Sequence, residues 1–355
     1  MPPRVRISKT TADAPEPDRV EGFPHPRETF RFVGQGQALV RASRVIRGGY
    51  PPQAWLITGP PGVGKATLAY RIARYALAHG ATSEGAEDLS VSEREANAAQ
   101  IAAGSHPGLL VLKRGLNDSG KMMSETSVHV VRKLSGFFGM TSAAGGWRIA
   151  IVDTADDMND AAANALLKML EEPPPRAMLL LLSNVPGRLL PTIRSRCQRL
   201  DLRPLDANAL EEELARLLPD MPTAERTSLA RLASGSLGMA LQLAGGDGVA
   251  LARDADNLLD CAAAPDIAAI LALGDRVARI TDGLPNLGEF LIEALMTRIR
   301  ARAFEGRGRL DRWVECLNRL NAGFTRTSAL NLEPRQTLLS AAGQLAAATK
   351  RAGAL

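Results

Sequence analysis

The stretch from residue 54 to residue 80 constrains the fold more than any other part of this sequence. A short apolar segment, AWLIT, runs into the glycine-rich loop GPPGVGK, and ATLAYRIARYALAHG follows with apolar residues at helical spacing and a closing glycine. A strand that enters a glycine loop and leaves it as a helix is the context of a phosphate-binding loop. Further strands alternate with helices after this stretch, and that alternation predicts a parallel sheet covered on both faces.

The loop departs from the full phosphate-binding pattern at one position. It keeps the glycines that permit a tight backbone path and the lysine that adds positive charge beside the backbone N–H groups: Gly59, Gly62, Gly64 and Lys65. The next position should carry a hydroxyl that holds Mg²⁺, but it is Ala66, and the hydroxyl comes one residue later on Thr67. Thr67 lies about 100° further round the helix, so it is a poor substitute.

Strands and helices alternate along the first two hundred residues. Apolar strands are predicted over 54–58, 108–112, 147–153 and 177–183, with helices between them. Beyond Leu202 the strand signal stops and the patterns are helical to the end. The predicted fold class is therefore α/β, with a parallel-sheet domain followed by helical domains. Residues 1–27 are rich in proline and poor in large apolar groups, and we expect a flexible tail there.

A hydrolytic site also requires carboxylates at the end of a buried strand. Asp153 ends the strand 147–153 and could orient a metal ion, but its neighbour is Thr154, which cannot accept a proton at neutral pH. Asp156 and Asp157 lie beyond the strand, and the sequence favours solvated loop or helix-cap charges for them. No carboxylate pair has the arrangement of a two-metal site, so polymerase chemistry in this chain is not expected.

Composition narrows the function classes further. Lys and Arg exceed Asp and Glu by 43 to 38, which is compatible with contact to a nucleic-acid backbone without requiring it. An aromatic content of 4% does not favour a platform of aromatic side chains on which bases stack. The three cysteines are widely spaced and indicate neither a disulfide framework nor a metal site. No apolar run is long enough for a membrane helix and no signal peptide is visible, so a cytoplasmic location is expected.

Two further stretches carry a family resemblance. NALLKMLEEPPP (164–175) and LLPTIRSRCQRLDLRPL (189–205), taken with the glycine loop and the HPGLLVL strand, resemble the bacterial sliding-clamp loader family of AAA+ proteins. Within that family the combination is most similar to the delta-prime subunits of DNA polymerase III. The resemblance covers roughly residues 28–245.

The resemblance implies a domain organisation and a set of partners. An AAA+ P-loop domain is expected over 28–203, a small helical lid over 204–246 and an all-α collar, which joins subunits, over 247–355. The implied partners are the other clamp-loader subunits, delta and gamma/tau, in a hetero-pentameric ring. The sliding clamp and primed DNA would be met through that complex.

The resemblance also assigns site residues. Ser195-Arg196-Cys197 matches the family's SRC motif, whose arginine acts in trans on the γ-phosphate bound by an adjacent subunit. A guanidinium delivered in this way stabilises charge on the transferring phosphoryl group. Ser183 and Asn184 close a strand where the family has a polar sensor.

The sequence departs from the active members of the family at three positions. Ala66 removes a metal ligand, Thr154 replaces the catalytic carboxylate, and Gly238 stands where the lid motif G-S-x-R has its arginine. The region 80–105, where many relatives carry a four-cysteine zinc module, contains no cysteine, so no zinc is expected.

Together these features predict a non-motor, stator-like clamp-loader subunit in DNA replication. It would have little or no ATPase activity, and weak or vestigial ATP binding at the loop and Asp153. Nucleotidyltransferase activity would belong only to the holoenzyme. One alternative is an active AAA+ loader ATPase of the gamma/tau type, and a small-molecule kinase is a more distant one.

Overall fold

The computed structural model describes residues 19–20, 22–49, 51–82, 84–113, 128–139, 146–245, 247–280, 283–304, 310–330 and 332–352. The chain divides into two compact units. The first comprises Met1–Glu213 together with Gly235–Met239, and the second comprises Leu214–Ser234 and Ala240–Leu355. The predicted lid (204–246) is thus divided: 204–213 and Gly235–Met239 belong to the first unit, and its remaining residues fall into the second unit with the predicted collar. The boundary at 246/247 stays a prediction.

A five-stranded parallel sheet forms the centre of the first unit. Its strand order is β2-β3-β4-β1-β5, and each strand runs parallel to its neighbour. The strands are β1 (Ala54–Thr58), β2 (Leu109–Leu112), β3 (Arg148–Val152), β4 (Ala177–Ser183) and β5 (Gln198–Asp201). The α/β class and the four apolar strands expected from the sequence are confirmed, with ends that differ by one residue at most.

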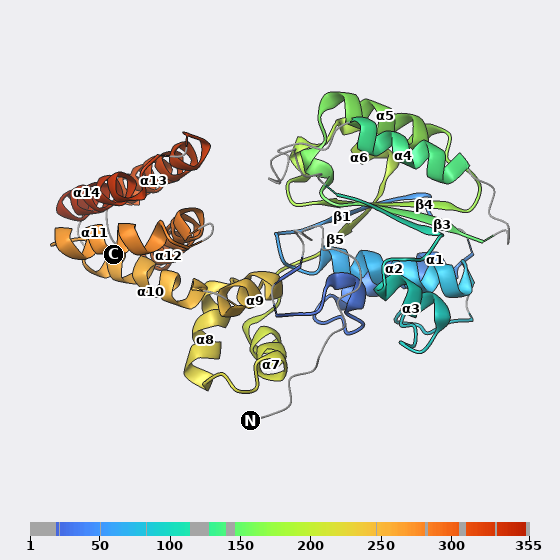
Figure 1. Cartoon of the computed structure of the whole chain (residues 1–355), viewed down its shortest axis with the longest axis horizontal. Helices are drawn as coiled ribbons and strands as arrows, with labels where there is room; N and C mark the ends of the chain where they lie inside the picture. The colour runs from blue at the N-terminus through green and yellow to red at the C-terminus, as the bar shows by residue number, and fades with distance from the viewer. Residues whose placement is uncertain are drawn as a thin grey trace. The chain divides into compact units, whose positions relative to one another are not determined.

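Helices cover both faces of this sheet because successive strand residues point to opposite sides. Figure 1 shows α1 (Gly36–Arg47), α2 (Lys65–His79) and α3 (Ala96–Ala102) on one face. The other face carries α4 (Val128–Gly139), α5 (Asp160–Glu171) and α6 (Pro191–Arg196). Along β1, Trp55 and Ile57 belong to the first core, whereas Leu56 belongs to the second. Short 3-10 turns occupy Pro26–Glu28, Ala155–Asp157 and Pro186–Arg188.

The strand β5 was not predicted from the sequence. Its residues QRLD are mostly polar, and only Leu200 is buried, because β5 is an edge strand that pairs with β1 alone. A half-exposed edge strand of four residues lacks the apolar run by which the other strands were found. This missed strand positions the SRC stretch, since Arg196 and Cys197 immediately precede it.

The predicted flexible tail extends too far along the chain. His25 is fully buried, and the Arg27 side chain donates a hydrogen bond to the backbone oxygen of Ala102. Arg74, which is 1% exposed, donates to the backbone oxygens of Arg27 and Thr29. Polar contacts rather than apolar burial hold this segment, which is why a hydropathy pattern does not reveal it. Residues 1–18 lie outside the described residues.

The second unit is helical throughout its described part. It contains α8 (Thr223–Leu232), α10 (Gly248–Asp260), α11 (Ile267–Val277), α12 (Gly283–Phe304), α13 (Leu310–Leu330) and α14 (Pro334–Ala352). α7 (Ala207–Leu217) and α9 (Leu237–Gly245) each span the division between the units. α12 packs against α10 and α13, and α14 packs against α11 and α13.

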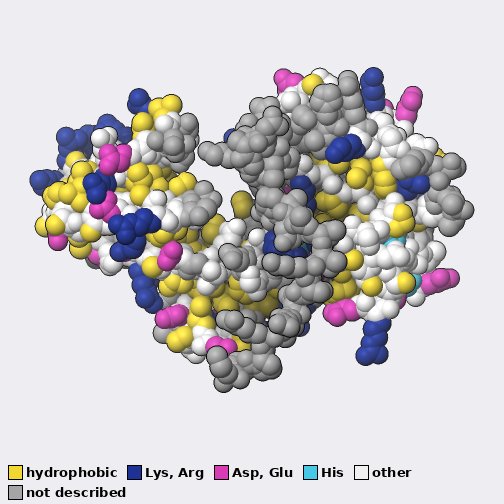
Figure 2. All heavy atoms as spheres, in the orientation of Figure 1, with side chains coloured by type: hydrophobic (Ala, Val, Ile, Leu, Met, Phe, Trp, Pro, Cys, Tyr) yellow, Lys and Arg dark blue, Asp and Glu magenta, His cyan; other side chains and the backbone are white. Residues whose placement is uncertain are grey.

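The charged side chains of the second unit are largely paired with one another. Arg298 contacts Asp256 and Asp260, and Arg312 contacts Glu315. Figure 2 shows basic and acidic side chains interspersed on the visible face of this unit. A mixed surface of this kind fits the expected solvated or intersubunit helix face better than a continuous track for a nucleic-acid backbone. None of the described helices combines the length and apolarity needed to cross a membrane.

Candidate functional site

The glycine loop joins β1 to α2, as the sequence predicts. Gly62 and Gly64 have φ angles of 71° and 101°, in the left-handed region that favours glycine. Between them Val63 is buried against the core of the α1–α2 face. The loop therefore has the strand–loop–helix placement of a phosphate-binding loop, with the N-terminus of α2 behind it.

The Lys65 side chain is bound by its own loop. Its Nζ donates hydrogen bonds to the backbone oxygens of Gly59 at 2.7 Å and Pro60 at 2.6 Å. Burial lowers the pKa of the Lys65 ammonium to about 8, although the carboxylates of Asp153 and Asp156 act in the opposite direction. In this structure the Lys65 ammonium, which would contact a phosphate, is instead hydrogen-bonded to two backbone carbonyl oxygens.

A segment distant in sequence lies directly against the loop. In Gly235–Met239, here called the closing segment, the Gly238 N–H donates to the backbone oxygen of Gly62 at 2.9 Å. The Ser236 hydroxyl donates to the backbone oxygen of Pro61, also at 2.9 Å. A Cβ added to Gly238 would lie 2.7 Å from the Gly62 Cα, so the two backbones approach too closely for any side chain.

This contact offers a structural reason why position 238 is glycine rather than the arginine of the lid motif. In the conformation described, position 238 has no room for a side chain because Gly62 lies against it. Gly62 is equally confined, since a Cβ there would lie 2.4 Å from the Ser236 Oγ. The sequence marked Gly238 as a lost arginine, and the structure adds that it makes a close backbone contact.

The other predicted nucleotide-site residues lie near the loop. Asp153 follows β3, its backbone N–H donates to Leu112, and its carboxylate is close enough to raise the pKa of Lys65. Thr154 comes next and is half-buried, at the position expected for a catalytic carboxylate. Ala66 and Thr67 are the second and third residues of α2.

Asp156 is held by several hydrogen bonds. Its carboxylate accepts hydrogen bonds from the Ser183 hydroxyl at 2.6 Å and from the backbone N–H groups of Asn184 and Val185. Asp156 is half-buried, and these donors converge on it from the end of the neighbouring strand β4, so it is not a freely solvated loop charge. Of the two predicted roles, the contact is closer to the helix cap, because two of the donors directly precede the 3-10 turn Pro186–Arg188. Polar residues closing an apolar strand were the only sequence signal for this contact.

Arg196 ends α6, just before β5. Its Nη2 contacts the Oε1 of Glu171 at 2.9 Å, and its Nη1 donates to the backbone oxygen of Thr192 at 3.2 Å. The side chain is 38% exposed. Ser195 donates its hydroxyl to Thr192, and burial raises the pKa of the Cys197 thiol to about 12, so this thiol stays protonated.

Arg196 and the glycine loop lie at opposite ends of the sheet. Trp55 is level with Gln198 and Thr58 is level with Asp201 in the parallel pair of β1 and β5. Arg196 precedes the start of this pair, whereas Gly59 follows its end. Three residue steps of strand separate the two ends, which places them at least about 10 Å apart.

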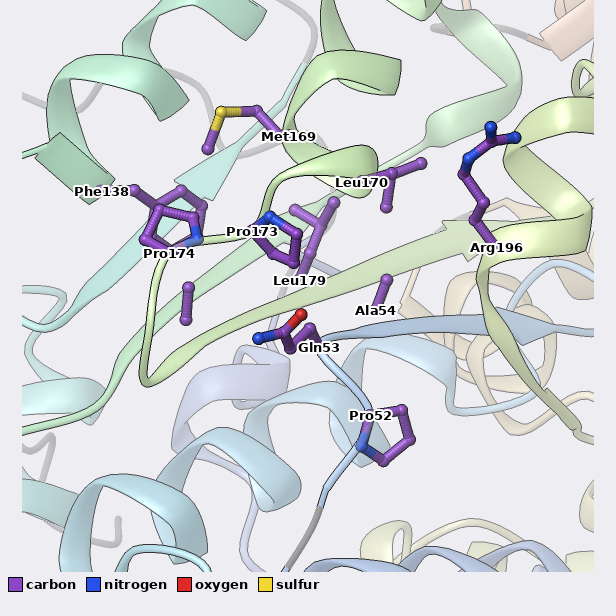
Figure 3. Close-up of a pocket in the computed structure, with 11 residues that line it drawn as sticks. Pro52, Gln53, Ala54, Phe138, Met169, Leu170, Pro173, Pro174, Leu179 and Arg196 are labelled. Atoms are coloured by element: carbon purple, nitrogen blue, oxygen red, sulfur yellow. The ribbon is translucent and has the colours of Figure 1, made fainter.

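A pocket of about 140 Å³ marks the Arg196 end of the sheet. It is lined by Gln53 and Ala54 at the start of β1, by Leu179 in β4, and by Leu170 and Pro173 near the end of α5. Figure 3 shows Arg196 at one end of this pocket, with its guanidinium pointing away from Ala54 and Gln53. The arginine is therefore directed outward from its own sheet.

Metal-binding groups do not gather at either place. Within the part of the chain that the structure describes, no three His, Cys, Asp or Glu side chains are placed to hold a metal ion. The expectation that the protein holds no zinc remains a prediction.

Comparison with known proteins identifies relatives of the first unit. A family model described as "DNA polymerase III, delta subunit" matches residues 34–206. The delta-prime subunit of DNA polymerase III from Pseudomonas aeruginosa is 40% identical over 184 residues, which cover 52% of this chain and 53% of that protein. The Escherichia coli delta-prime subunit is 34% identical over 213 residues, covering 59% of each.

One solved structure extends the likeness to most of the chain. A DNA polymerase III gamma-subunit-related protein from Thermotoga maritima matches with a TM-score of 0.52 and 19% identity, covering 87% of this chain and 99% of that one. At this identity the match concerns the fold alone. The chain spans between half and three-fifths of the length of the curated relatives above. Residues 34–206 of this chain are thus similar to the bacterial DNA polymerase III delta-prime subunits.

Proposed function

We propose that this protein is a non-motor, delta-prime-type subunit of the DNA polymerase III clamp loader. In this role it helps to load the sliding clamp onto primed DNA during replication, and it supplies Arg196 in trans to the ATP site of a neighbouring subunit. The observation that carries the proposal is the placement of Arg196 at the end of the sheet opposite to the chain's own glycine loop.

This placement supports action in trans rather than in cis. At least about 10 Å of sheet separates Arg196 from the loop, and the guanidinium points outward. In the proposed role, the phosphate that meets Arg196 belongs to a nucleotide bound by another subunit. A guanidinium delivered to a transferring phosphoryl group stabilises its charge and raises the rate by about 10³–10⁵-fold in known systems.

The chain's own loop is unsuited to hydrolysis. Ala66 supplies no metal ligand and Thr154 no general base, and loss of a general base alone costs about 10²–10⁴ in rate. The loop is also held closed, since Lys65 is bound by its carbonyls and Gly238 lies against Gly62. ATP binding would require Lys65 to leave Gly59 and Pro60, which supports weak or vestigial binding.

The proposed partners follow from this role. Arg196 requires an adjacent subunit that binds ATP, which in the loader would be a gamma/tau subunit, and delta completes a hetero-pentameric ring. The helices of the second unit would provide the collar contact. DNA polymerase activity would belong to the holoenzyme, and the protein would act in the cytoplasm.

The alternative is an active gamma/tau-like loader ATPase. The retained lysine and glycine loop favour it, because a phosphate cradle could re-form if the closing segment moved away. The two functions predict opposite effects of two substitutions. Lys65→Ala would slow an active ATPase, whereas Arg196→Ala would slow only the neighbour's site.

The experiment is ATP turnover by the reconstituted loader, stimulated by clamp and primed DNA. Each variant of this subunit is assembled with wild-type partners. We expect Arg196→Ala to lower turnover and Lys65→Ala to leave it near the wild-type rate. Comparable slowing by Lys65→Ala, or single-chain turnover that this substitution abolishes, would contradict the proposal.

A further inference from the structure

The carboxylate that holds Arg196 comes from a different helix. Glu171 is the last residue of α5, and its Oε1 lies 2.9 Å from the Arg196 Nη2. Together with the Thr192 backbone oxygen at 3.2 Å, it fixes the guanidinium at two points. Among the carboxylates of the described residues, Glu171 is the one that forms an ion pair with Arg196.

The location of Glu171 explains why the pair forms. A carboxylate at a helix C-terminus meets the negative end of the helix dipole, which is unfavourable unless a cation lies nearby. Arg196 supplies that cation, and it is itself the last residue of α6. Pro173 and Pro174 end the α5 helix directly beyond this point, so the chain holds Glu171 at the helix terminus.

The contact leaves most of the guanidinium available. Arginine has five N–H donors, and the contacts with Glu171 and Thr192 use one on each terminal nitrogen. The Arg196 side chain is 38% exposed and that of Glu171 51% exposed. A phosphate oxygen can therefore reach the remaining donors while Glu171 stays in place.

We propose that Glu171 is the positioning residue of the trans-acting arginine. It holds the Arg196 side chain in one outward orientation, so the neighbour's phosphate meets a guanidinium that has already lost its rotamer freedom. This proposal rests on the proposed function of Arg196. It goes beyond that function by assigning a role to Glu171, the last residue of α5.

The test is a double-mutant cycle in the reconstituted loader. Glu171→Ala should lower the Arg196-dependent part of the stimulated kcat by about 2–5-fold, the range of an exposed ion pair, with KM for ATP unchanged. In an Arg196→Ala background it should have no further effect. Glu171→Asp should recover part of the loss, and Glu172→Ala, a matched loss of one neighbouring carboxylate, should behave as wild type.

The outcomes separate this proposal from the one on which it rests. If Arg196→Ala itself has no effect on turnover, the proposed function fails and this inference fails with it. If Arg196→Ala slows turnover but Glu171→Ala does not, only the role of Glu171 is overturned. It is likewise overturned if Glu171→Ala slows both backgrounds equally, or if it raises turnover, which would make Glu171 a competitor of the phosphate. Thermal melts of each isolated variant exclude loss of folding as the cause.

Discussion

The contact between the closing segment and the glycine loop predicts that replacing Gly238 by alanine destabilises the protein, whereas a glycine-to-alanine substitution in a helix usually stabilises it. Gly238→Ala would place a Cβ 2.7 Å from the Gly62 Cα and 3.1 Å from its backbone oxygen, where ordinary contacts need about 3.5–4.0 Å. Relief of this overlap costs about 1–3 kcal/mol in a well-packed site. The gain from replacing glycine in a helix offsets about 0.5–1 kcal/mol of that cost.

A matched control isolates the contact from helix propensity. Gly136, inside α4 of the same unit, has nothing within 4 Å of its added Cβ, so Gly136→Ala should raise the free energy of unfolding by about 0.5–1 kcal/mol. Gly238→Ala should instead lower it by up to about 2.5 kcal/mol, the difference between the two terms above.

Two measurements check this prediction. Urea unfolding gives the free energies of the two variants, and hydrogen exchange reports on the amides of residues 59–65. Gly238→Ala should increase exchange in this segment, because the added methyl group pushes the closing segment away from the loop, whose Gly62 backbone oxygen accepts the hydrogen bond from the N–H of residue 238. Equal stabilisation by both substitutions, with unchanged protection of the loop, would refute the close contact and the closed state of the loop.

Three further predictions concern charged side chains of the first unit that are bound by backbone groups. Asp156→Ala should lower the free energy of unfolding by about 2–4 kcal/mol, because it leaves three hydrogen-bond donors without their acceptor. Asp220→Ala, at an exposed position, should change it by under about 0.5 kcal/mol. Equal effects of the two substitutions in urea unfolding would contradict the Asp156 contact. Arg74→Lys should cost about 2–4 kcal/mol because an ammonium does not span the two carbonyls that the guanidinium joins, and a loss below about 0.5 kcal/mol would exclude this role. For Lys65 the folded pKa of about 8 lies below the unfolded value of 10.5, so the unfolded chain binds more protons between these values and stability should rise with pH across this window. Relative to Lys65→Met the rise should be about 1–3 kcal/mol in urea titrations, and parallel pH profiles of the two proteins would contradict the burial of the charge.

Local patterns were sufficient for most of the sheet. The strands 54–58 and 177–183 were predicted at their observed ends, because a strand buried on both faces is a continuous apolar run bounded by turn residues. The edge strand β5 escaped the same reasoning, since only Leu200 of its four residues is buried. The ordered structure of residues 25–29 was missed as well. Hydrogen bonds from Arg74, rather than apolar contacts, hold this segment.

The candidate site divides in the same way. The glycine loop, its lysine and the missing hydroxyl at Ala66 were readable from spacing, because phosphate recognition uses backbone groups that are adjacent in sequence. The role of Arg196 came from a resemblance, and the sequence held no signal for its contact with Glu171, which lies 25 positions away.

The sequence by itself therefore determined the local units, which are the strand, the loop and the helix. It also showed which groups they lack, namely the metal-binding hydroxyl at Ala66 and the catalytic carboxylate at Thr154. Only the tertiary structure decided that Gly238 meets Gly62, that Asp156 meets Ser183, and that Arg196 faces away from its own loop. These pairings join residues that are tens to more than a hundred positions apart. The order of the strands in the sheet brings them together or separates them, and that order follows from how the cores on both faces pack, which no local pattern records.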